Sequence, residues 1–529
     1  MKLVIVGGVA GGASAAARAR RLNEDAEIVI FEKGPYVSFA NCGLPYHIGG
    51  VIKNRGELLL HTPKSLKDRF NFDVHVKHEV TKINVDGHTV TVRNLLKDEE
   101  FEETYDKLIL SPGARAFIPP VSGADGDNVF TLKTIPEMDS IKDFIEKKTP
   151  KHATVIGGGY IGIEAAENLK ERGLEVAVVE MAPQVMTPVD EDMAAILHEH
   201  IRLHDVKLHL GVKLKALEHS ANGRTKVVVD GAPSFDTDFI VMAVGVRPEN
   251  SLAKNAGLEI GPRGGIVVDD TMKTSSPDIY AVGDVVQVSD PVTGNLVQIP
   301  LASPANRQGR LAADNIFGRE VHYRGTMGTA ICKVFDMAVA TTGQTEKACI
   351  RDKRPFKTMT VHPMSHTSYY PGACRLSLKI VFDPRTGTLL GAQSIGVDGA
   401  DKRIDVLATA ITAKMTVFDL EHLELCYAPP YGAAKDPVNL AGFAAANMLR
   451  GDHQAITVRE LDELKKDSYV LLDIRRPEER AAGVIEGTLE IPLCQLRDRL
   501  EELPKDKEVI IYCAIGHRGY IGQRILSQK

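Results

Sequence analysis

The chain has 529 residues, 43% of them hydrophobic, and a formal net charge of −6 at pH 7. This length predicts three or four domains, and the charge balance provides no basic face for nucleic acid. The seven cysteines are scattered rather than arranged as a disulfide framework, which favours a reducing cytoplasm. The apolar runs are too short to cross a membrane, and the apolar start ends in glycines followed by arginines. We therefore expect neither a membrane span nor a signal peptide.

The chain opens with the pattern of a dinucleotide-binding βαβ unit. We expect a strand at 3–6, an alanine-rich helix up to Leu22, and a strand at 27–31 that ends in Glu32 and Lys33. The turn between the first strand and the helix consists of Gly7, Gly8, Val9, Ala10, Gly11 and Gly12. Such glycines let the backbone approach a pyrophosphate, and an acid such as Glu32 accepts a ribose hydroxyl. Val9 replaces the second glycine of the usual fingerprint, which weakens this motif when it is taken alone.

A lone cysteine, Cys42, lies in the segment 38–46 shortly after this unit. The next cysteine is Cys332, so Cys42 has no local partner for a redox pair. If it receives electrons from a flavin, its partner sulfur must come from the substrate. Its thiolate would then need nearby positive charge or N–H donors to be ionised near neutral pH. The alternative is a buried structural cysteine, because free cysteine behaves as a small hydrophobic side chain.

A second βαβ unit follows the fingerprint in full. A strand at 153–156, a helix up to Arg172 and a strand at 175–179 end in the acid Glu180. The turn and the start of its helix contain Gly157, Gly159, Tyr160, Ile161 and Gly162. A carboxylate at Glu180 favours two free ribose hydroxyls and would repel a 2′-phosphate. No arginine follows directly to bind that phosphate, so NADH is preferred and NADPH stays open as an alternative.

Three further segments read as buried strands that end in tight turns. Their turns contain Ser111, Pro112, Gly113, Gly245, Gly283 and Asp284. The Asp284 carboxylate stands at the end of a strand, where it could hold a ribityl hydroxyl. Two dinucleotide sites in one chain suggest FAD in one and a nicotinamide nucleotide in the other.

With these motifs, residues 1 to about 450 resemble the flavoprotein disulfide reductases with two dinucleotide folds, specifically the coenzyme A-disulfide reductases. The lone-cysteine segment 38–46 is the most specific match, supported by 365–372 and 427–436. The resemblance implies an α/β fold with two nested Rossmann-like domains, an α+β dimerisation domain and a homodimer. The implied boundaries are 1–115 and 246–320 for the FAD-binding domain, 116–245 for the NAD-binding domain and 325–448 for the dimerisation domain.

The resemblance also implies a mixed disulfide between Cys42 and coenzyme A. The implied coenzyme A contacts are Ser14, Arg18, Arg21, Ser38, Asn41, Arg69, Asn306 and Lys435. Arg69 is the weaker candidate, because the family's usual lysine position falls on Phe70. For the arginines the alternative is a solvated helix face, and Arg20 fits that alternative best.

Tyrosines are the other residues to which the resemblance assigns roles. Tyr369 and Tyr427 match tyrosines that reach the neighbouring subunit's active site in relatives, although they could be interface aromatics only. Tyr160 is expected to cover the flavin, with Glu164 orienting that pocket, whereas His366 and His422 are expected to be structural. No metal site is expected.

The C-terminal part changes character. A strand at 469–472 leads to Asp473, and a strand at 508–512 leads to Cys513 and Arg518. A cysteine at the start of a loop that runs into a helix gathers N–H groups around its sulfur. This part, 455–529, resembles a rhodanese domain, whose cysteine carries a persulfide. Rhodanese domains usually continue with another strand, so a copy ending at Lys529 is expected to be shortened or partly disordered.

The sequence therefore predicts a reductase of coenzyme A disulfide, coenzyme A persulfide or polysulfide that uses FAD and NADH. Catalytic roles fall to Cys42 and Cys513, with Tyr369 and Tyr427 assisting. The alternative is an NADH oxidase or peroxidase that cycles Cys42 through sulfenic acid. Those relatives use a histidine in the first glycine turn, where this chain has Ala10. A third interpretation is a sulfur carrier or redox sensor.

Overall fold

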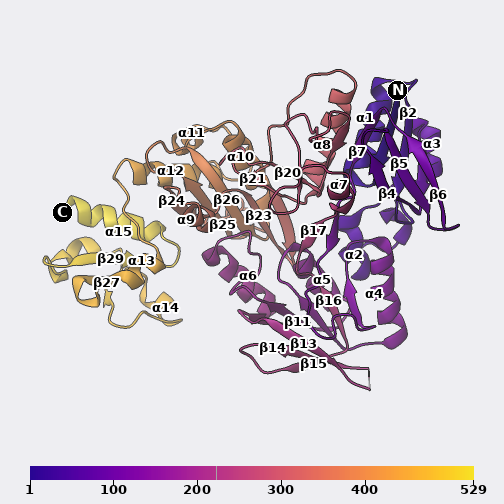
Figure 1. The fold of residues 1–529 in the computed structure, drawn as a ribbon. Coiled ribbons are helices and arrows are strands. Elements are labelled where there is room, and N and C mark those ends of the chain that lie inside the picture. The colour runs from indigo at the N-terminus through magenta and orange to yellow at the C-terminus, as the bar shows by residue number, and fades with distance from the viewer. Residues whose placement is uncertain (222) are drawn as a thin grey trace. The chain divides into compact units, whose positions relative to one another are not determined.

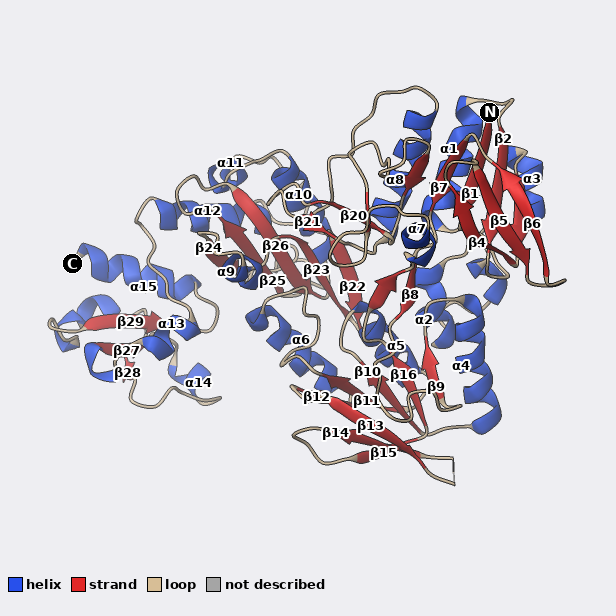
Figure 2. Ribbon diagram, viewed as in Figure 1, coloured by secondary structure: helices blue, strands red, loops and turns tan. Residues whose placement is uncertain are grey.

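The computed structural model describes residues 1–221 and 223–529 and divides into two units, Met1–Asp336 and Met337–Lys529 (Figure 1). Both units combine helices with strands, as the mixed colouring of Figure 2 shows. Among the described residues, no helix has the length and apolar composition that crossing a bilayer requires. The architecture is thus mixed α/β, as predicted.

The first unit contains two parallel sheets of five strands each. The first sheet has the order β19-β7-β1-β2-β3, so that β19, late in the chain, pairs with the early strand β7. Its elements are β1 (Lys2–Val6), α1 (Ala10–Leu22), β2 (Glu27–Glu32), β3 (Asp73–Val76), β7 (Lys107–Leu110) and β19 (Ile279–Ala281). The strands are apolar because both faces of a parallel sheet are covered, and Leu3 and Ile5 are fully buried.

The second sheet has the order β12-β11-β10-β16-β9 and repeats the strand–turn–helix–strand design. Its elements are β9 (Val129–Thr131), α4 (Ile135–Lys148), β10 (His152–Ile156), α5 (Tyr160–Glu171), β11 (Glu175–Glu180), α6 (Glu191–Leu203), β12 (Val206–Leu210) and β16 (Phe239–Met242). Here too β10 pairs with β11 and β16 in parallel, so both glycine turns lie at the carboxyl ends of central strands.

Smaller elements complete the first unit. Near Cys42 these are η1 (Asn41–Gly43), α2 (Leu44–Ile48), η2 (Arg55–Leu58) and α3 (Pro63–Phe70). An antiparallel sheet contains β4 (His78–Asn84), β5 (Thr89–Asn94) and β6 (Glu99–Thr104), and another contains β13 (Leu214–His219), β14 (Thr225–Val229) and β15 (Phe235–Thr237). The rest are β8 (Ala114–Ala116), β17 (Val246–Pro248), α7 (Ser251–Asn255), β18 (Ile266–Val267), β20 (Val286–Ser289), β21 (Leu296–Val297), α8 (Ala302–Ile316) and β22 (Ala330–Val334).

In the second unit, four antiparallel strands lie in the order β23-β26-β25-β24. The elements are β23 (Met337–Gly343), α9 (Glu346–Arg351), β24 (Lys357–Val361), β25 (Leu376–Phe382), β26 (Leu389–Gly396), α10 (Ala400–Thr412), α11 (Val417–Glu421) and α12 (Pro437–Leu449). A buried ion pair joins two of the helices, with Arg403 Nη2 2.9 Å from the Asp436 carboxylate. Each partner is almost inaccessible to water, so removing either one would leave a buried charge without its partner.

The C-terminal part of this unit is a parallel sheet in the order β28-β27-β29. Its elements are α13 (Val458–Glu463), η3 (Lys466–Ser468), β27 (Tyr469–Asp473), α14 (Pro477–Arg480), β28 (Leu489–Glu490), η4 (Leu496–Asp498), η5 (Leu500–Glu502), β29 (Glu508–Tyr512) and α15 (His517–Gln528). A small core around Leu472, Ile474 and Ile491 supports it.

Close backbone packing explains the glycines of both turns. A Cβ at Gly12 would overlap the Gly7 carbonyl oxygen, and a Cβ at Gly162 would overlap the Gly157 carbonyl oxygen in the same way. Each helix therefore touches the turn before it through backbone alone. Gly159 differs, because a Cβ there would meet no atom within 4 Å. This glycine leaves open space at the start of α5.

Two alanine substitutions separate these roles. Gly162→Ala is expected to lower the free energy of unfolding by about 1–3 kcal/mol, because overpacking against backbone outweighs the gain in helix propensity. Gly159→Ala is expected to change it by less than about 0.5 kcal/mol, because its methyl group meets only open space. Urea denaturation of both variants tests this difference. Equal midpoints for the two variants would contradict the packing argument.

Candidate active site

The two acids at the ends of β2 and β11 are held in the same way. Glu32 accepts hydrogen bonds from the backbone N–H groups of Gly8 at 2.8 Å and Gly34 at 2.7 Å. Glu180 accepts from Gly158 and Ala182, both at 2.7 Å. Burial raises the pKa of Glu32, although its two backbone donors act in the opposite direction. Each acid closes its glycine turn and still has lone pairs for a further donor such as a ribose hydroxyl.

Ser111 joins three glycines of the first unit into one backbone cradle. A Cβ at Gly7 would overlap the Ser111 carbonyl oxygen, and a Cβ at Gly11 would lie 2.8 Å from its hydroxyl. Gly283 faces the same hydroxyl, and its N–H donates to Gln308 at 2.8 Å. A cradle of bare backbone at the ends of parallel strands fits the pyrophosphate of a dinucleotide.

The other predicted cofactor residues differ in their surroundings. Asp284 lies 3.4 Å from the Lys133 ammonium. Lys33 points to the surface, where it pairs with Glu79 at 2.7 Å. Gly113 and Gly245 have positive φ angles, 72° and 99°, and a Cβ at either would meet open space.

Cys42 opens onto a groove of about 590 Å³ in the first unit. Seven of the residues predicted as coenzyme A contacts line this groove: Ser14, Arg18, Arg21, Ser38, Asn41, Arg69 and Asn306. Of the predicted coenzyme A contacts, Lys435 alone belongs to the second unit, where it is exposed. The structure adds Arg310 and His61, together with the apolar side chains Phe39, Leu60 and Phe70. Neither His61 nor Arg310 stands in a motif, so the sequence had no signal for them.

The arginines of this groove differ in their partners. Arg18 is tied to Asp314 by two hydrogen bonds, at 2.9 and 2.5 Å, so its charge is balanced within the protein. Arg21 and Arg69 both lie over the Phe70 ring, 5.5 and 5.2 Å from its centroid. In the described part of the chain, Arg21, Arg69 and Arg310 form no ion pair, so their charges are available to an anionic ligand.

Arg20 corrects one sequence-based interpretation. It was expected to lie on a solvated helix face, but only 6% of it is exposed. Its guanidinium donates to the backbone carbonyls of Phe70 at 2.8 Å and Asn71 at 2.7 Å, and it reaches two further carbonyls at the end of α1. Arg20 thus ties α1 to the end of α3, a contact that its helical position could not reveal.

The surroundings of Cys42 oppose ionisation of its thiol. Burial raises the pKa of Cys42, the carboxylates of Glu164 and Asp284 raise it further, and Lys133 lowers it. Lys133 supplies the positive charge that a thiolate at this position would need, and the two carboxylates act against it. Glu164 accepts a hydrogen bond from the Tyr46 hydroxyl at 3.0 Å, which fixes its carboxylate on α5.

Tyr160 and Cys332 lie in the buried part of this region. Burial raises the pKa of Tyr160 and that of the Cys332 thiol. Cys332 Sγ lies 3.3 Å from the Lys333 carbonyl oxygen and is almost completely buried. Cys332 is thus a packed thiol, whereas Cys42 opens onto the groove.

In the second unit, Tyr369 and Tyr427 form an exposed pair. Their hydroxyl oxygens are 3.0 Å apart, with 73% of Tyr369 and 47% of Tyr427 accessible. The hydrogen bond from Tyr427 lowers the pKa of Tyr369, whereas that of Tyr427 is raised. His366 is buried and bonds to the Thr367 carbonyl oxygen at 3.1 Å, which fits the structural role expected of it.

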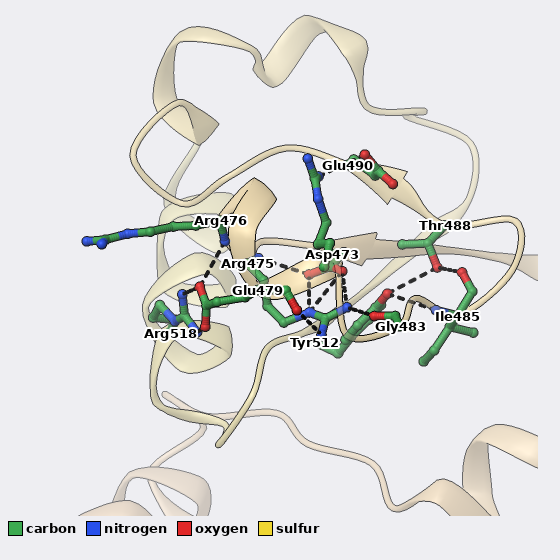
Figure 3. A network of polar contacts seen from close by, with 11 residues as sticks. Asp473, Arg475, Arg476, Glu479, Gly483, Ile485, Thr488, Glu490, Tyr512 and Arg518 are labelled. Atoms are coloured by element: carbon green, nitrogen blue, oxygen red, sulfur yellow. Dashed lines mark hydrogen bonds and ion pairs between the residues drawn. The ribbon is translucent and has the colours of Figure 1, made fainter.

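Cys513 lies at the end of β29 and lines a pocket of about 280 Å³ with Arg475 and Tyr512. Figure 3 shows how the charges around this pocket are paired: Asp473 binds Arg475, and Glu479 binds Arg518 through two contacts of 2.6 Å. The Arg518 guanidinium lowers the pKa of Glu479 to about 2. Arg475 and Glu479 were not among the predicted functional residues. Arg475 binds Asp473, and Glu479 binds Arg518, and both of these partners were predicted.

The pKa of Cys42 provides a direct test of this electrostatic arrangement. Because the Glu164 carboxylate raises that pKa, Glu164→Gln is expected to let the thiolate form at lower pH. The rate of Cys42 alkylation by iodoacetamide, measured against pH, should shift to the acid side. Lys133→Gln should shift it to the alkaline side. Glu501→Gln, which removes an exposed carboxylate of the second unit, serves as the control. Superimposable profiles for Glu164→Gln and the parent would refute the arrangement.

Comparison with known proteins agrees with this geometry. The family model described as pyridine nucleotide-disulphide oxidoreductase matches residues 1–309, its dimerisation domain matches 329–436, and a rhodanese-like domain matches 457–529. A coenzyme A disulfide reductase of Staphylococcus haemolyticus is 36% identical over 449 residues, which cover 84% of this chain and 100% of the relative. An NADH oxidase of Methanocaldococcus jannaschii is 37% identical over 454 residues, 85% of this chain and 99% of the relative.

Two solved structures are similar over the whole chain. The reduced CoADR-RHD of Bacillus anthracis has a TM-score of 0.97 and 50% identity, covering 100% of this chain and 94% of that one. The NAD-dependent persulfide reductase from A. fulgidus has a TM-score of 0.94 and 36% identity, covering 100% and 97%. The nested sheets, the glycine cradles and these matches together show that the chain belongs to the pyridine nucleotide-disulphide oxidoreductase family and carries a rhodanese-like domain.

Proposed function

We propose that this protein is an FAD-containing, NADH-dependent reductase of coenzyme A disulfide, coenzyme A persulfide or polysulfide. The observation that carries the proposal is the groove onto which Cys42 opens, with three arginines that have no carboxylate partner among the described residues. Coenzyme A carries a 3′-phosphate and a pyrophosphate, which such cations recognise. The names of the Staphylococcus haemolyticus relative and of the persulfide reductase from A. fulgidus support the same substrate class.

The two glycine turns, Gly7–Gly12 as the first cradle and Gly157–Gly162 as the second, would provide the dinucleotide sites of this enzyme. Segments 1–115 and 246–320 would hold FAD through the first cradle and Glu32, and 116–245 would hold NADH through the second cradle and Glu180. When bound, the two dinucleotides supply a pair of electrons to the sulfur at position 42. Glu180 is followed by Met181 and Ala182, which offer no cation for the 2′-phosphate of NADPH. Segments 325–448 and 455–529 would be the dimerisation and rhodanese-like domains.

Cys42 would act as nucleophile and electron acceptor in turn. Its thiolate attacks one sulfur of coenzyme A disulfide, which forms the Cys42–coenzyme A mixed disulfide and expels one coenzyme A thiolate. Two electrons and a proton then cleave the mixed disulfide into the Cys42 thiolate and a second coenzyme A thiol. Burial and two carboxylates disfavour the Cys42 thiolate. They would therefore favour the mixed disulfide, which carries no charge on sulfur, over the thiolate.

Substrate binding divides the groove into two parts. Arg21, Arg69 and Arg310 would bind the phosphates, and the Phe70 ring holds the first two guanidiniums in place. Ser14, whose hydroxyl bonds to Asn306, would contact the neutral pantetheine arm. Arg18 would act mainly by tying α1 to α8 through Asp314.

A homodimer would complete the site. By resemblance, Tyr369 and Tyr427 would reach the active site of the neighbouring subunit, and Lys435 would add a cation there. The lowered pKa of Tyr369 suits it to donate a proton to a leaving thiolate.

An NADH oxidase is the second candidate, favoured by the name of the Methanocaldococcus jannaschii relative. In that reaction oxygen, rather than a disulfide, would oxidise Cys42 through sulfenic acid. Ala10 lines the groove where such relatives have a histidine, so this chain offers no base there. Anaerobic NADH consumption with coenzyme A disulfide distinguishes the two, since an oxidase would be inactive without oxygen.

The sulfur at position 42 is the critical test. The purified enzyme should carry an adduct of coenzyme A mass that Cys42→Ser lacks, and this variant should lose turnover by at least about 10³-fold, because it has no sulfur to form the disulfide. Cys494→Ser, which changes another exposed free cysteine, should retain both adduct and turnover. Full coenzyme A disulfide turnover in Cys42→Ser would exclude the mechanism.

The rhodanese-like part can be tested separately. If Cys513 passes sulfane sulfur to the reductase, Cys513→Ser should slow NADH oxidation with polysulfide and leave turnover of coenzyme A disulfide unchanged. Steady-state rates with the two substrates, measured side by side, provide this comparison. Undiminished polysulfide turnover would show that Cys513 has no part in it.

A further inference from the structure

Three potential metal ligands meet in the first unit, and none of them belongs to either glycine turn. His200 lies on α6 and His204 directly follows it, one helical turn apart, and Asp336 lies in the turn after β22. One potential ligand atom from each lies within 4.8 Å of the others. No metal site was predicted from the sequence. Asp336 is remote from both histidines along the chain, so no local pattern marks the cluster.

The hydrogen bonds around His204 leave one ring nitrogen available for a cation. His204 Nδ1 lies 3.0 Å from the His200 carbonyl oxygen, a position from which it donates its hydrogen. The lone pair is then on Nε2, which lies 3.8 Å from Asp336 Oδ1. Metal-binding histidines likewise donate one ring N–H to a backbone carbonyl, which leaves the other nitrogen free to bind the ion.

His200 presents a buried nitrogen to the same point. Only 8% of His200 is exposed, and its Nε2 lies 2.7 Å from Asp336 Oδ1. This nitrogen nevertheless lacks a hydrogen-bond partner of acceptable geometry among the described residues. The carboxylate oxygen is thus close to the nitrogen but off its hydrogen-bonding direction, which leaves the lone pair unsatisfied in a buried place.

The other side of the cluster is held rigidly. Phe335 stacks on the His204 ring, with centroids 4.0 Å apart and planes inclined by 9°. The Phe335 N–H donates to the buried Glu167 carboxylate at 2.8 Å, which anchors the turn that carries Asp336. Another histidine of α6, His198, is excluded because its Nε2 accepts a hydrogen bond from the Val185 N–H.

We propose that His200, His204 and Asp336 bind a divalent cation of the zinc class, with water as fourth ligand. Two imidazole nitrogens and one carboxylate favour zinc over magnesium or calcium, which prefer oxygen ligands. Tetrahedral zinc with bonds of about 2.0–2.2 Å places its ligand atoms about 3.4 Å apart. His204 Nε2, now 3.8 Å from Asp336 Oδ1, would move closer, and the 2.7 Å between His200 Nε2 and Asp336 Oδ1 would widen. The partly exposed side chains of His204 and Asp336 have room for these movements. The ion would tie α6 to the turn after β22.

The test compares zinc binding by matched variants of the full-length, flavin-loaded protein after chelator treatment. His204→Phe keeps the stacking on Phe335 but removes the ligand nitrogen, and Asp336→Asn keeps the size of an exposed side chain but removes its charge. Calorimetric titration with zinc should find one site per chain that each variant weakens by at least about tenfold. X-ray absorption at the zinc edge should show imidazole and carboxylate ligands.

A matched control separates this site from other zinc binding. His209 stacks on Phe235, with centroids 4.6 Å apart and planes at 9°, but lies outside the cluster, so His209→Phe should bind zinc as the parent does. Zinc held by thiols such as Cys42 would persist in every one of these variants. If His204→Phe and Asp336→Asn bind as much zinc as the parent, with the same affinity, the cluster is only an ion pair between His200 and Asp336, and the proposal is wrong. Should His204→Phe fail to fold, Asp336→Asn alone decides.

Discussion

Direct contact between the backbone of a helix and the turn before it is the constraint on which the catalytic part of the molecule depends. Gly12 lies against Gly7, and Gly162 against Gly157, with no room for a side chain between them. This contact sets each helix over the end of its central strand and brings the N–H groups of the turn to the closing acid. The same contact places α1 beside the groove, so the position of Ser14, Arg18 and Arg21 follows from it.

The site combines two opposed electrostatic regions. Around the sulfur, burial and the carboxylates of Glu164 and Asp284 favour the neutral form of Cys42. Along the groove, Arg21 and Arg69 remain without carboxylate partners in the described part of the chain. An anionic substrate would be held by the groove while its sulfur reacts in a region that disfavours a free thiolate. In the proposed reaction, this combination would favour a disulfide between Cys42 and substrate over the separate thiolates.

The sequence predicted local arrangements well and distant partnerships poorly. The strands, turns and acids of both βαβ units appear where the motifs indicated, because glycine spacing and apolar runs are local properties. The same analysis placed Arg20 on a solvated face, although it binds backbone carbonyls at the end of α3. Nor could it foresee that Asp314 neutralises Arg18, since the two residues are far apart in the chain.

The amino-acid sequence by itself determined the family, the two dinucleotide motifs and the lone cysteine of segment 38–46, because each of these is a short pattern with a physical requirement at every position. Only the tertiary structure decided which arginines lack a carboxylate partner among the described residues, which charged groups surround Cys42, and that His200 of α6 and the following His204 meet Asp336. Charge and coordination depend on distances of a few ångströms between residues remote in sequence. Folding, rather than local pattern, brings such groups together.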